Sequence, residues 1–297
     1  MTTTVTTEKT TGQPEERFDF KGMIEPVWCP GCGDFALLNA IRSALRQMPE
    51  VERQNTIVIS GIGCSGRVAA YLGVYGFHGV HGRALPTALG VKEANPSLNV
   101  LVMGGDGDGF SIGGGHIPHA ARRNPNMTYI VFDNEIYGLT KGQVSPTSPK
   151  GLAGKSTPEW PALEEPLNPL AMLIAYNVSF VARVYAGSPK TTTQIVKEAI
   201  AHPGFAVVQA MSPCTTFYNT YKLWAKQVRT LPEDYDPTDR MAAFARALDT
   251  ETMWLGIFYR EERPTYEEMI AQQAARLRGD EELSDDERLR RLIDSFV

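Results

Sequence analysis

Short apolar runs rich in β-branched residues recur along the chain, and the segments between them are long enough to hold helices. Five runs are candidate strands: TIVIS (56–60), NVLVMGG (99–105), MTYIVFDN (127–134), SFVARVY (179–185) and FAVVQAM (205–211). Each run is almost continuously apolar, as strands covered on both faces are. The alternation of strands and helices predicts an α/β fold, a doubly wound and mostly parallel sheet.

Two segments outside this alternation have compositions of their own. Residues 1–16 are polar and rich in Thr, and we expect a disordered tail there because such a segment buries too little apolar surface to order itself. Six prolines fall between Pro146 and Pro169. So many helix and strand breakers predict a long irregular loop, either a lid or a partner contact, with a tolerated surface insertion as the alternative.

The composition changes again beyond about residue 230. We therefore expect a main domain at 17–230 and a C-terminal extension at 231–297. In the extension, Ser284 and Glu287 form a capping-box pattern. Apolar residues then follow on one helical face: Leu289, Leu292, Ile293 and Phe296. We expect this short amphipathic helix to dock on its own domain, with docking on another subunit as the alternative.

The bulk composition narrows the classes of protein. With 297 residues, 42% of them hydrophobic and 21% charged, the chain can bury a large core without disulfides. A net charge of -5 and the lack of a concentrated basic stretch argue against nucleic acid as a partner. No apolar run approaches the roughly 18 residues of a membrane span, and the first 16 residues lack the apolar core of a signal peptide. We expect no membrane association and a cytoplasmic location.

Three of the predicted strands lead into segments with unusual chemistry. TIVIS is followed by GIGCSGR, NVLVMGG by DGDGFSIGGGH, and MTYIVFDN by EIYGLTKGQ. In doubly wound sheets ligands bind beyond the carboxyl ends of the strands. The sequence therefore predicts the functional site at this edge of the sheet.

Asp106 and Asn134 follow two of these strands and have the chemistry of magnesium ligands. Mg²⁺ takes six oxygens, so both side chains and the carbonyl of Ile136 would leave positions free for a diphosphate. The glycines around Asp106 let backbone amides approach phosphate oxygens, and a helix starting near Ser111 would point its N-terminus at them. A GDG followed about 25 residues later by Asn is typical of a thiamine diphosphate site. A tight turn that only satisfies its own backbone is the alternative.

Other glycines and histidines favour different sites only weakly. GIGCSG at 61–66 fits the G-x-G-x-x-G pattern of a nicotinamide or flavin site. However, a cysteine occupies the turn, and the next acid, Glu93, does not end a strand. A hydrogen bond from His81 to a diphosphate fits the site, whereas we expect ordinary hydrogen-bonding roles for the other histidines of this region: His78, His116 and His119.

The chain has four cysteines, and all of them can reach the same edge of the sheet. Cys29 and Cys32 precede a predicted first helix, Cys64 follows the strand at 56–60, and Cys214 follows the strand at 205–211. In a reducing cytoplasm such thiols are metal ligands or buried residues more often than disulfides. The spacing is neither a compact ferredoxin pattern nor a zinc ribbon. By spacing alone, zinc and a cubane iron–sulfur cluster both remain open.

Together these motifs carry a resemblance to a known family. WCPGCGDF, GIGCS, HGRALPTALGVK, GDGDGFSIGGGHIPHAARRN and DNEIYGLTKGQVSPTSP occur in this order. They resemble the beta subunit of a 2-oxoacid:ferredoxin oxidoreductase and are most similar to the 2-oxoglutarate-type enzymes. The resemblance runs from about Phe18 to Cys214 and continues weakly through LGIFYREERPTYEEM.

The resemblance implies a set of site residues. One 4Fe-4S cluster would be bound by Cys29, Cys32, Cys64 and Cys214, and Mg²⁺ by Asp106, Asn134 and the carbonyl of Ile136. Lys141 would face the 2-oxoacid or coenzyme A. Thiamine diphosphate would be lined by Ile62, Gly63, Ser65, His81, Gly107, Asp108, Gly138 and Leu139.

The resemblance also implies an activity and partners. The enzyme would decarboxylate a 2-oxoacid oxidatively, form an acyl-CoA with coenzyme A, and pass electrons to ferredoxin. The combination is coherent because thiamine diphosphate is an electron sink and an iron–sulfur cluster removes electrons singly. Thiamine enzymes also need a Glu on the aminopyrimidine, normally from another domain or chain, and we find no second doubly wound unit here. We therefore expect an alpha subunit, in an alpha2beta2 heterotetramer.

The substrate is less closely defined than the class. We expect 2-oxoglutarate, with pyruvate or another 2-oxoacid as the alternative, because the pocket that recognises the substrate tail is expected on the partner. A non-oxidative thiamine diphosphate decarboxylase with structural zinc is a second enzyme hypothesis. A scaffold protein that has kept the fold is the non-enzyme hypothesis, and the intact Asp106 and Asn134 argue against it.

Overall fold

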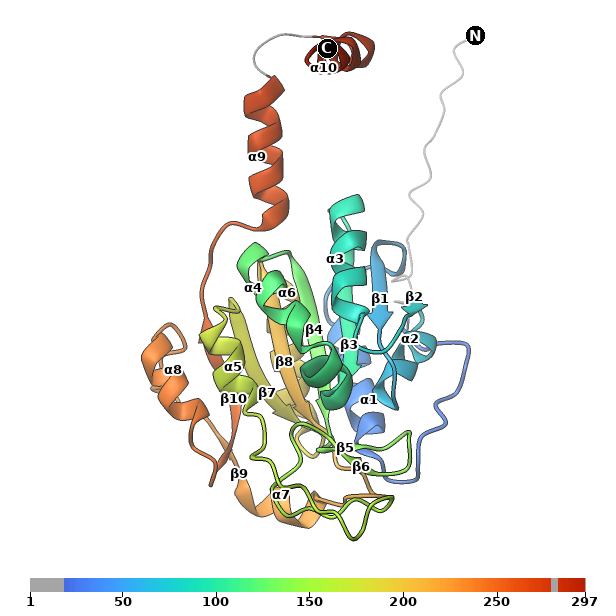
Figure 1. Ribbon diagram of the computed structural model, residues 1–297, viewed down its shortest axis with the longest axis vertical. Coiled ribbons are helices and arrows are strands. Elements are labelled where there is room, and N and C mark those ends of the chain that lie inside the picture. The colour runs from blue at the N-terminus through green and yellow to red at the C-terminus, as the bar shows by residue number, and fades with distance from the viewer. Residues whose placement is uncertain (1–18, 279–282, 297) are drawn as a thin grey trace, which may run out of the picture.

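A computed structural model describes residues 19–278 and 283–296, so the expected tail at 1–16 lies outside the described residues. Eight strands form one sheet in the order β2-β1-β3-β4-β8-β7-β10-β9 (Figure 1). Their bounds are β1 (Thr56–Ser60), β2 (Tyr75–His78), β3 (Asn99–Gly105), β4 (Met127–Asp133), β7 (Phe180–Tyr185), β8 (Phe205–Met211), β9 (Val228–Thr230) and β10 (Met253–Arg260). Two short strands pair separately: β5 (Ile136–Tyr137) and β6 (Gln143–Val144).

The predicted fold class is confirmed. All five predicted strands are present, and the six strands from β2 to β7 in the sheet order run parallel. β10, which pairs antiparallel with β7, was not among the predicted strands. Only part of β10 is buried, because it lies near the sheet edge, so its residues do not form a continuously apolar run. β9 and β10 belong to the same sheet as the strands of the expected main domain. The expected domain boundary near residue 230 stays a prediction.

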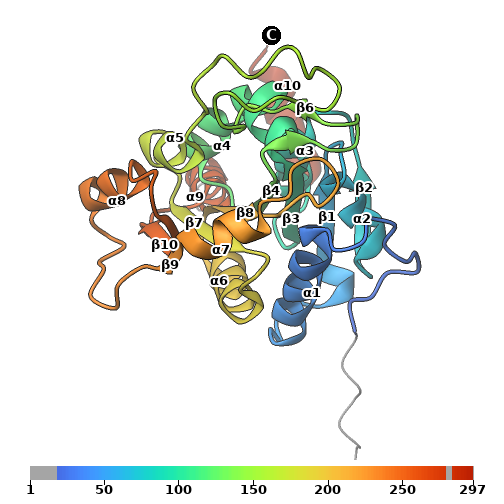
Figure 2. The ribbon, with the colours of Figure 1, turned by 90° about the horizontal axis from the view of Figure 1, so that it is seen from below.

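Helices cover both faces of the sheet, and alternate residues of each strand point to opposite layers (Figure 2). Leu101 and Met103 of β3 belong to one core, together with α1 (Gly33–Arg46), α2 (Val68–Tyr71) and α6 (Pro189–Ala201). Val100 and Val102 belong to the other core, which includes α3 (Ala84–Ala94), α4 (Ile117–Arg123), α5 (Pro169–Ala175) and α8 (Arg240–Ala247). None of the helices in the described part of the chain is long and apolar enough to cross a membrane.

The strand order brings the chemically unusual segments together. β1, β3, β4 and β8 are neighbours, with Ser60 opposite Met103, Gly105 opposite Phe132 and Asp133 opposite Met211. Parallel strands present their carboxyl ends at one edge. The segments that follow these strands, with Cys64, Asp106, Asn134 and Cys214, therefore meet at the lower edge in Figure 1.

The proline-rich segment is irregular, as predicted. Residues 145–168, all of them described, contain no helix or regular strand. Backbone hydrogen bonds hold the loop together, from Gly151 to Ala162 and from Leu167 to Pro146. A role as a lid or a partner contact stays a prediction.

The C-terminal helix is confirmed, but the expected docking is wrong. α7 (Tyr221–Gln227) lies at the site edge of the sheet, whereas α9 (Tyr266–Arg278) and α10 (Asp285–Asp294) extend from the opposite edge (Figure 1). Ser284 and Glu287 form the predicted capping box. The apolar side chains of the helix are more than half exposed: Leu289, Leu292, Ile293 and Phe296. In this structure they contact no core of their own chain, because α10 stands away from the sheet.

Candidate active site

A cavity of about 260 Å³, the glycine cavity, lies beyond the carboxyl ends of β1, β3 and β4. Every side chain and glycine expected to line thiamine diphosphate is part of its wall, as are the three expected magnesium ligands. The wall also contains Cys64 and Gly105, and two residues that were not predicted from the sequence, Tyr137 and Thr140. The structure thus gathers one predicted set of residues around a single space.

Asp108 fixes the shape of the glycine cavity. Its Oδ1 accepts hydrogen bonds from the backbone amides of Ile62 (2.9 Å) and Gly82 (2.7 Å), and it lies 2.8 Å from Nδ1 of His81. The carboxylate is only 2% exposed. It therefore ties the loop after β1 to the loop that precedes α3, and it holds His81 at the rim of the cavity.

Asp106 is buried beside a second carboxylate. The hydroxyl Oγ1 of Thr147 lies 2.8 Å from Oδ2 of Asp106 and 2.8 Å from Oδ1 of Asp133. A hydroxyl has one hydrogen to donate, so both contacts cannot be donated to ionised carboxylates at once. Burial and then repulsion from Asp133 raise the pKa of Asp106 to about 7. Negative charge is thus concentrated where a cation would offset it.

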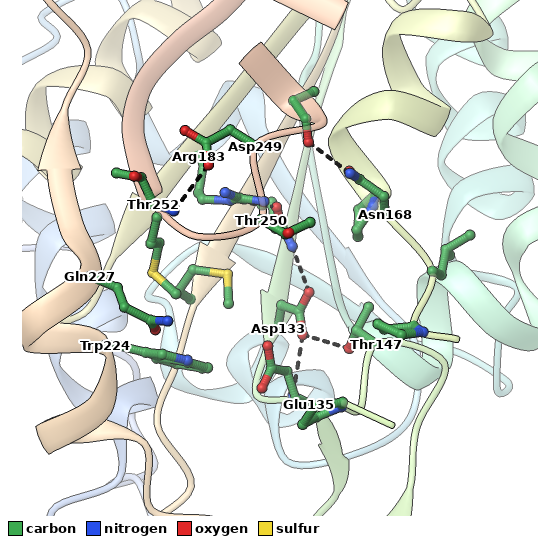
Figure 3. A pocket seen from close by; sticks show the side chains of 18 of the residues that line it. Asp133, Glu135, Thr147, Asn168, Arg183, Trp224, Gln227, Asp249, Thr250 and Thr252 are labelled. Atoms are coloured by element: carbon green, nitrogen blue, oxygen red, sulfur yellow. Dashed lines mark hydrogen bonds between the residues drawn. The ribbon is translucent and has the colours of Figure 1, made fainter. Parts of the chain in front are cut away.

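Asp133 of this pair lines a neighbouring cavity of about 290 Å³, the acid cavity (Figure 3). Glu135 lines it, and burial, followed by the charges of Asp133 and Asp106, raises the pKa of Glu135 to about 9. The guanidinium of Arg183 donates from Nε to Gln209 (2.8 Å) and attracts both Asp133 and Glu135. The cation of Arg183 thus faces two carboxyl groups, those of Asp133 and Glu135.

The turn after β4 places Asn134 at the wall of the glycine cavity. Glu135 has a φ of +57°, a left-handed conformation that is uncommon for a residue other than glycine. Oδ1 of Asn134 accepts the amide of Ile136 at 3.1 Å. The side chain of Asn134 and residue Ile136 consequently face the same space as Asp106. This donor set of carboxylate, amide and carbonyl fits Mg²⁺.

The helical segment after Asp106 begins earlier than predicted. A π-helical turn spans Gly107–Ile112, with Asp106 at its N-cap, so the expected start near Ser111 is wrong by about one turn. The reason is steric: glycines at 107 and 109 allow the chain to coil directly against Tyr137 and Tyr129. Tyr137 in turn donates its hydroxyl to the carbonyl of Gly107 (3.3 Å).

All four cysteines line a third cavity, the cysteine cavity, of about 230 Å³. Their loops are tied together by hydrogen bonds, from Nε1 of Trp28 to the carbonyl of Cys64 (2.8 Å) and from Oγ1 of Thr215 to the carbonyl of Pro30 (2.9 Å). The Sγ atoms of Cys64 and Cys214 lie 3.6 and 3.8 Å from the point where a Cβ of Gly138 would be. The predicted convergence of the cysteines is therefore present.

The four thiols are free: Cys29 is exposed, Cys32 and Cys64 are half-buried, and Cys214 is buried. Burial raises the pKa of Cys64 to about 11, and the nearby Asp34 and Cys214 add to the effect. Burial, followed by the charge of Asp34, also raises the pKa of Cys32. Across residues 19–278 and 283–296, no three His, Cys, Asp or Glu side chains are close enough to hold a single metal ion. The cysteines thus surround a space without closing on one point.

The glycine and cysteine cavities share a wall. Cys64, Asn134, Gly138 and Leu139 line both. Lys141, in contrast, lines only the cysteine cavity and is not part of the wall of the glycine cavity, and its expected role toward the 2-oxoacid or coenzyme A stays a prediction. Groups bound in the two cavities would be separated by little more than one layer of side chains.

Two residues that matter to this arrangement were not predicted from the sequence. Tyr137 lies in the wall of the glycine cavity, together with Gly138 and with Asn134, an expected magnesium ligand. Its position in the motif EIYG was the sequence feature that could have identified it. Thr147 gave no signal, because its contacts with Asp106 and Asp133 span 41 and 14 residues of sequence.

Comparisons with family models agree with this geometry. Residues 61–210 match the family described as thiamine pyrophosphate enzyme, C-terminal TPP binding domain. Residues 214–275 match the family that describes the C-terminal part of the pyruvate ferredoxin oxidoreductase beta subunit. The first match includes β3, β4 and every residue that lines the glycine cavity.

Known relatives extend the comparison over most of the chain. The chain is 42% identical over 261 residues to the 2-oxoacid:ferredoxin oxidoreductase subunit beta of Sulfolobus sp., covering 82% of this chain and 85% of the relative. It is 46% identical over 208 residues to the 2-oxoglutarate oxidoreductase subunit KorB of Mycobacterium tuberculosis, covering 70% of this chain and 55% of the relative. A solved structure aligns with a TM-score of 0.87 and 41% identity, covering 92% of this chain and 94% of that one. It is the 2-oxoglutarate:ferredoxin oxidoreductase of Magnetococcus marinus with 2-oxoglutarate, coenzyme A and succinyl-CoA bound.

Proposed function

The chain belongs to the family of 2-oxoacid:ferredoxin oxidoreductase beta subunits, and from this premise we propose that its enzyme oxidises 2-oxoglutarate with coenzyme A to succinyl-CoA and CO2. The observation that carries the proposal is the shared wall of the glycine and cysteine cavities. The 2-oxoglutarate relatives support this substrate, and pyruvate or another 2-oxoacid is the alternative.

Mg²⁺ and thiamine diphosphate occupy the glycine cavity in this proposal. Asp106, Asn134 and the carbonyl of Ile136 would hold the metal, and its charge would offset the carboxylates of Asp106 and Asp133, whose pKa values are raised by burial, with Asp133 adding to the effect on Asp106. The eight wall residues expected from the sequence line the diphosphate and the ring system. Bound there, thiamine diphosphate supplies the electron sink for decarboxylation.

A 4Fe-4S cluster occupies the cysteine cavity. A single zinc ion requires all of its thiolates about 2.3 Å from one point, and the described cysteines do not meet this requirement. The four thiols surround a space, and this arrangement suits a cluster, which is larger than one ion and is bound at its corners. Coordination would also keep Cys32 and Cys64 as thiolates, against the burial that raises the pKa of both.

The partners follow from the family to which the chain belongs. An alpha subunit brings the Glu that activates the aminopyrimidine and most of the substrate pocket, in an alpha2beta2 assembly. A cluster held by the four cysteines would supply the one-electron chemistry by which electrons reach a ferredoxin. The enzyme is cytoplasmic. The loop at 145–168 closes over the site or contacts the partner, and Lys141 meets coenzyme A or the acid from the cysteine side.

The proposal is tested on the enzyme purified with its alpha subunit. A panel of 2-oxoacids is assayed with coenzyme A and a viologen dye as the electron acceptor. We expect 2-oxoglutarate to have the highest kcat/KM, at least about tenfold above pyruvate. A higher kcat/KM with pyruvate than with 2-oxoglutarate would instead indicate a pyruvate-specific enzyme. Turnover without dye reduction would favour a non-oxidative decarboxylase.

Gly107 offers a local test of the glycine cavity. A Cβ at this position would lie 2.0 Å from Cε1 of Tyr137, inside the ring's van der Waals surface. Gly107→Ala should therefore displace Tyr137 from the wall and weaken thiamine diphosphate binding about 10- to 100-fold. Calorimetric titration of the cofactor into the stripped complex measures this.

Gly114→Ala is the matched control for that variant. It lies in the same glycine-rich segment, but a Cβ there meets no atom within 4 Å. We expect its cofactor affinity to stay within about twofold of the wild type. Equal losses in both variants would contradict the assignment of Tyr137 to the cofactor wall.

A further inference from the structure

We propose that Thr147 and Gln209 are positioning residues that align Asp106 for its cation, through a hydrogen-bond relay that begins at Arg183. The inference rests on the proposed function, because it requires Mg²⁺ at Asp106. It also assigns a role to the acid cavity, which the proposed reaction does not use: Arg183, Gln209 and Thr147 all line that cavity.

The relay begins with a buried amide whose orientation is fixed by its two neighbours. Nε of Arg183 donates to Oε1 of Gln209 (2.8 Å), and Nε2 of Gln209 donates to Oδ2 of Asp133 (2.7 Å). A guanidinium can only donate and an ionised carboxylate can only accept, so the amide of Gln209 cannot turn over without losing both contacts. Arg183 and Gln209 lie opposite each other on the paired strands β7 and β8. The sheet itself thus fixes the side of Asp133 that the relay reaches.

Thr147 continues the relay from Asp133 to Asp106. Gln209 contacts Oδ2 of Asp133, and the hydroxyl of Thr147 lies at the other oxygen, Oδ1, at 2.8 Å (Figure 3). The same hydroxyl lies 2.8 Å from Oδ2 of Asp106. A contact at one oxygen restricts the rotation of a carboxylate, and outer hydrogen bonds of this kind orient metal ligands. The relay therefore crosses four neighbouring strands, β7, β8, β4 and β3, to reach the expected ligand.

The same network holds the turn that carries the other expected magnesium ligands. The backbone amide of Glu135 donates to Oδ1 of Asp133 (3.2 Å), and Oγ of Ser148 donates to the carbonyl of Glu135 (2.5 Å). Glu135 stands between Asn134 and Ile136 in the chain. The loops after β3 and β4 are thus held to one set of hydrogen bonds, which fits a network that sets their relative position.

Thr147→Val tests the relay because it removes the hydroxyl and keeps the shape of the side chain. Ser145 and the backbone of Gly107 also form hydrogen bonds with Asp106, so the ligand should be loosened and not lost. We expect the Mg²⁺ concentration for half-maximal binding of thiamine diphosphate to rise about tenfold, and kcat at saturating Mg²⁺ to stay within about twofold. Calorimetric titration of the stripped complex with its alpha subunit, at a series of Mg²⁺ concentrations, measures the binding.

Two further variants separate hydrogen bonding from packing. Thr147→Ser keeps the hydroxyl and loses a methyl group, so its Mg²⁺ requirement should stay within about twofold of the wild type. Gln209→Met keeps the length of the side chain and removes its amide. Because Gln209 acts one step farther from Asp106, we expect its Mg²⁺ requirement to rise about threefold. This variant also tests the relay if Thr147→Val does not fold.

Thr128→Val is the matched control. Thr128 is buried on β4, the strand that ends with Asp133, and its Oγ1 donates to the carbonyl of Ala199 (3.1 Å). The same chemical change is thus made near the amino end of the strand, away from the relay. We expect a lower melting temperature, because a buried hydrogen bond is lost, and an unchanged Mg²⁺ requirement.

The relay and the proposed function fail in different ways. An unchanged Mg²⁺ requirement in Thr147→Val, or in Gln209→Met if Thr147→Val does not fold, overturns the relay and leaves the proposed function intact. An equal rise in Thr128→Val also overturns it, since the effect would then follow from general loosening of the fold. A wild-type complex that binds no thiamine diphosphate at any Mg²⁺ concentration overturns the proposed function itself.

Discussion

Replacing Asp106 by Asn is expected to lower kcat/KM about a thousandfold and to abolish Mg²⁺-dependent binding of thiamine diphosphate. The side chain of Asp106 is 3% exposed and lines the glycine cavity beside Asn134. A carboxylate from the protein surface therefore cannot reach this position to replace it. An amide keeps the shape but removes the charge that a divalent cation requires. Activity with 2-oxoglutarate and viologen, together with bound cofactor after gel filtration, measures both effects.

The loss should not come from unfolding. Burial and Asp133 raise the pKa of Asp106 to about 7, which means that its ionised form destabilises the cofactor-free fold above that pH. Asp106→Asn removes this repulsion, so at about pH 8 the cofactor-free variant should melt at the same temperature as the wild type or higher. A lower melting temperature would show that the carboxylate is needed for folding rather than for the cation.

Asp133→Asn is the matched control. Asp133 makes the other contact with Thr147, yet it lines the acid cavity and is absent from the wall of the glycine cavity. We expect its kcat/KM to fall less than about tenfold, because the metal keeps its carboxylate. If both variants lost cofactor equally, the acid pair would act as one unit and Asp106 alone could not be the ligand.

The difference between what the sequence predicted and what it missed follows from contact range. β1, β3, β4, β7 and β8 are buried on both faces, so their continuous apolar runs identify them without any knowledge of neighbours. β10 and β2 lie at or near the sheet edges, where partial exposure removes that signal. Site residues that directly follow buried strands were predictable for the same reason.

The unpredicted parts of the site depend on contacts between distant segments. Thr147 comes from the irregular loop, and nothing in PTSP indicates that its hydroxyl reaches two buried carboxylates. The position of Lys141 depends on a left-handed residue, with a φ of +83°, which turns the side chain toward the cysteine cavity. Side chains on loops are placed by the tertiary fold, and local pattern does not encode that placement.

Replacing Cys64 by Ser is expected to remove the iron–sulfur cluster and to lower viologen reduction at least about a hundredfold, while thiamine diphosphate still binds. Thiolates suit iron because they are soft, negatively charged ligands, and a serine hydroxyl stays protonated at neutral pH and binds iron weakly. Cys64 lies in the shared wall of the two cavities, so its loss should interrupt electron flow at the step closest to the cofactor. Iron and sulfide analysis and the brown absorbance of the purified complex measure cluster content.

Cofactor affinity distinguishes a lost cluster from a collapsed site in the Cys64→Ser enzyme. The glycine cavity keeps its magnesium ligands and the Asp108 contacts, so thiamine diphosphate affinity should stay within about threefold of the wild type. Thr215→Ser, which lines the same cavity as the four cysteines and retains the hydroxyl that binds Pro30, should keep full iron content and activity. A wild-type complex that is colourless and carries one zinc in each copy of this chain would overturn the cluster and leave four cysteines around a structural metal.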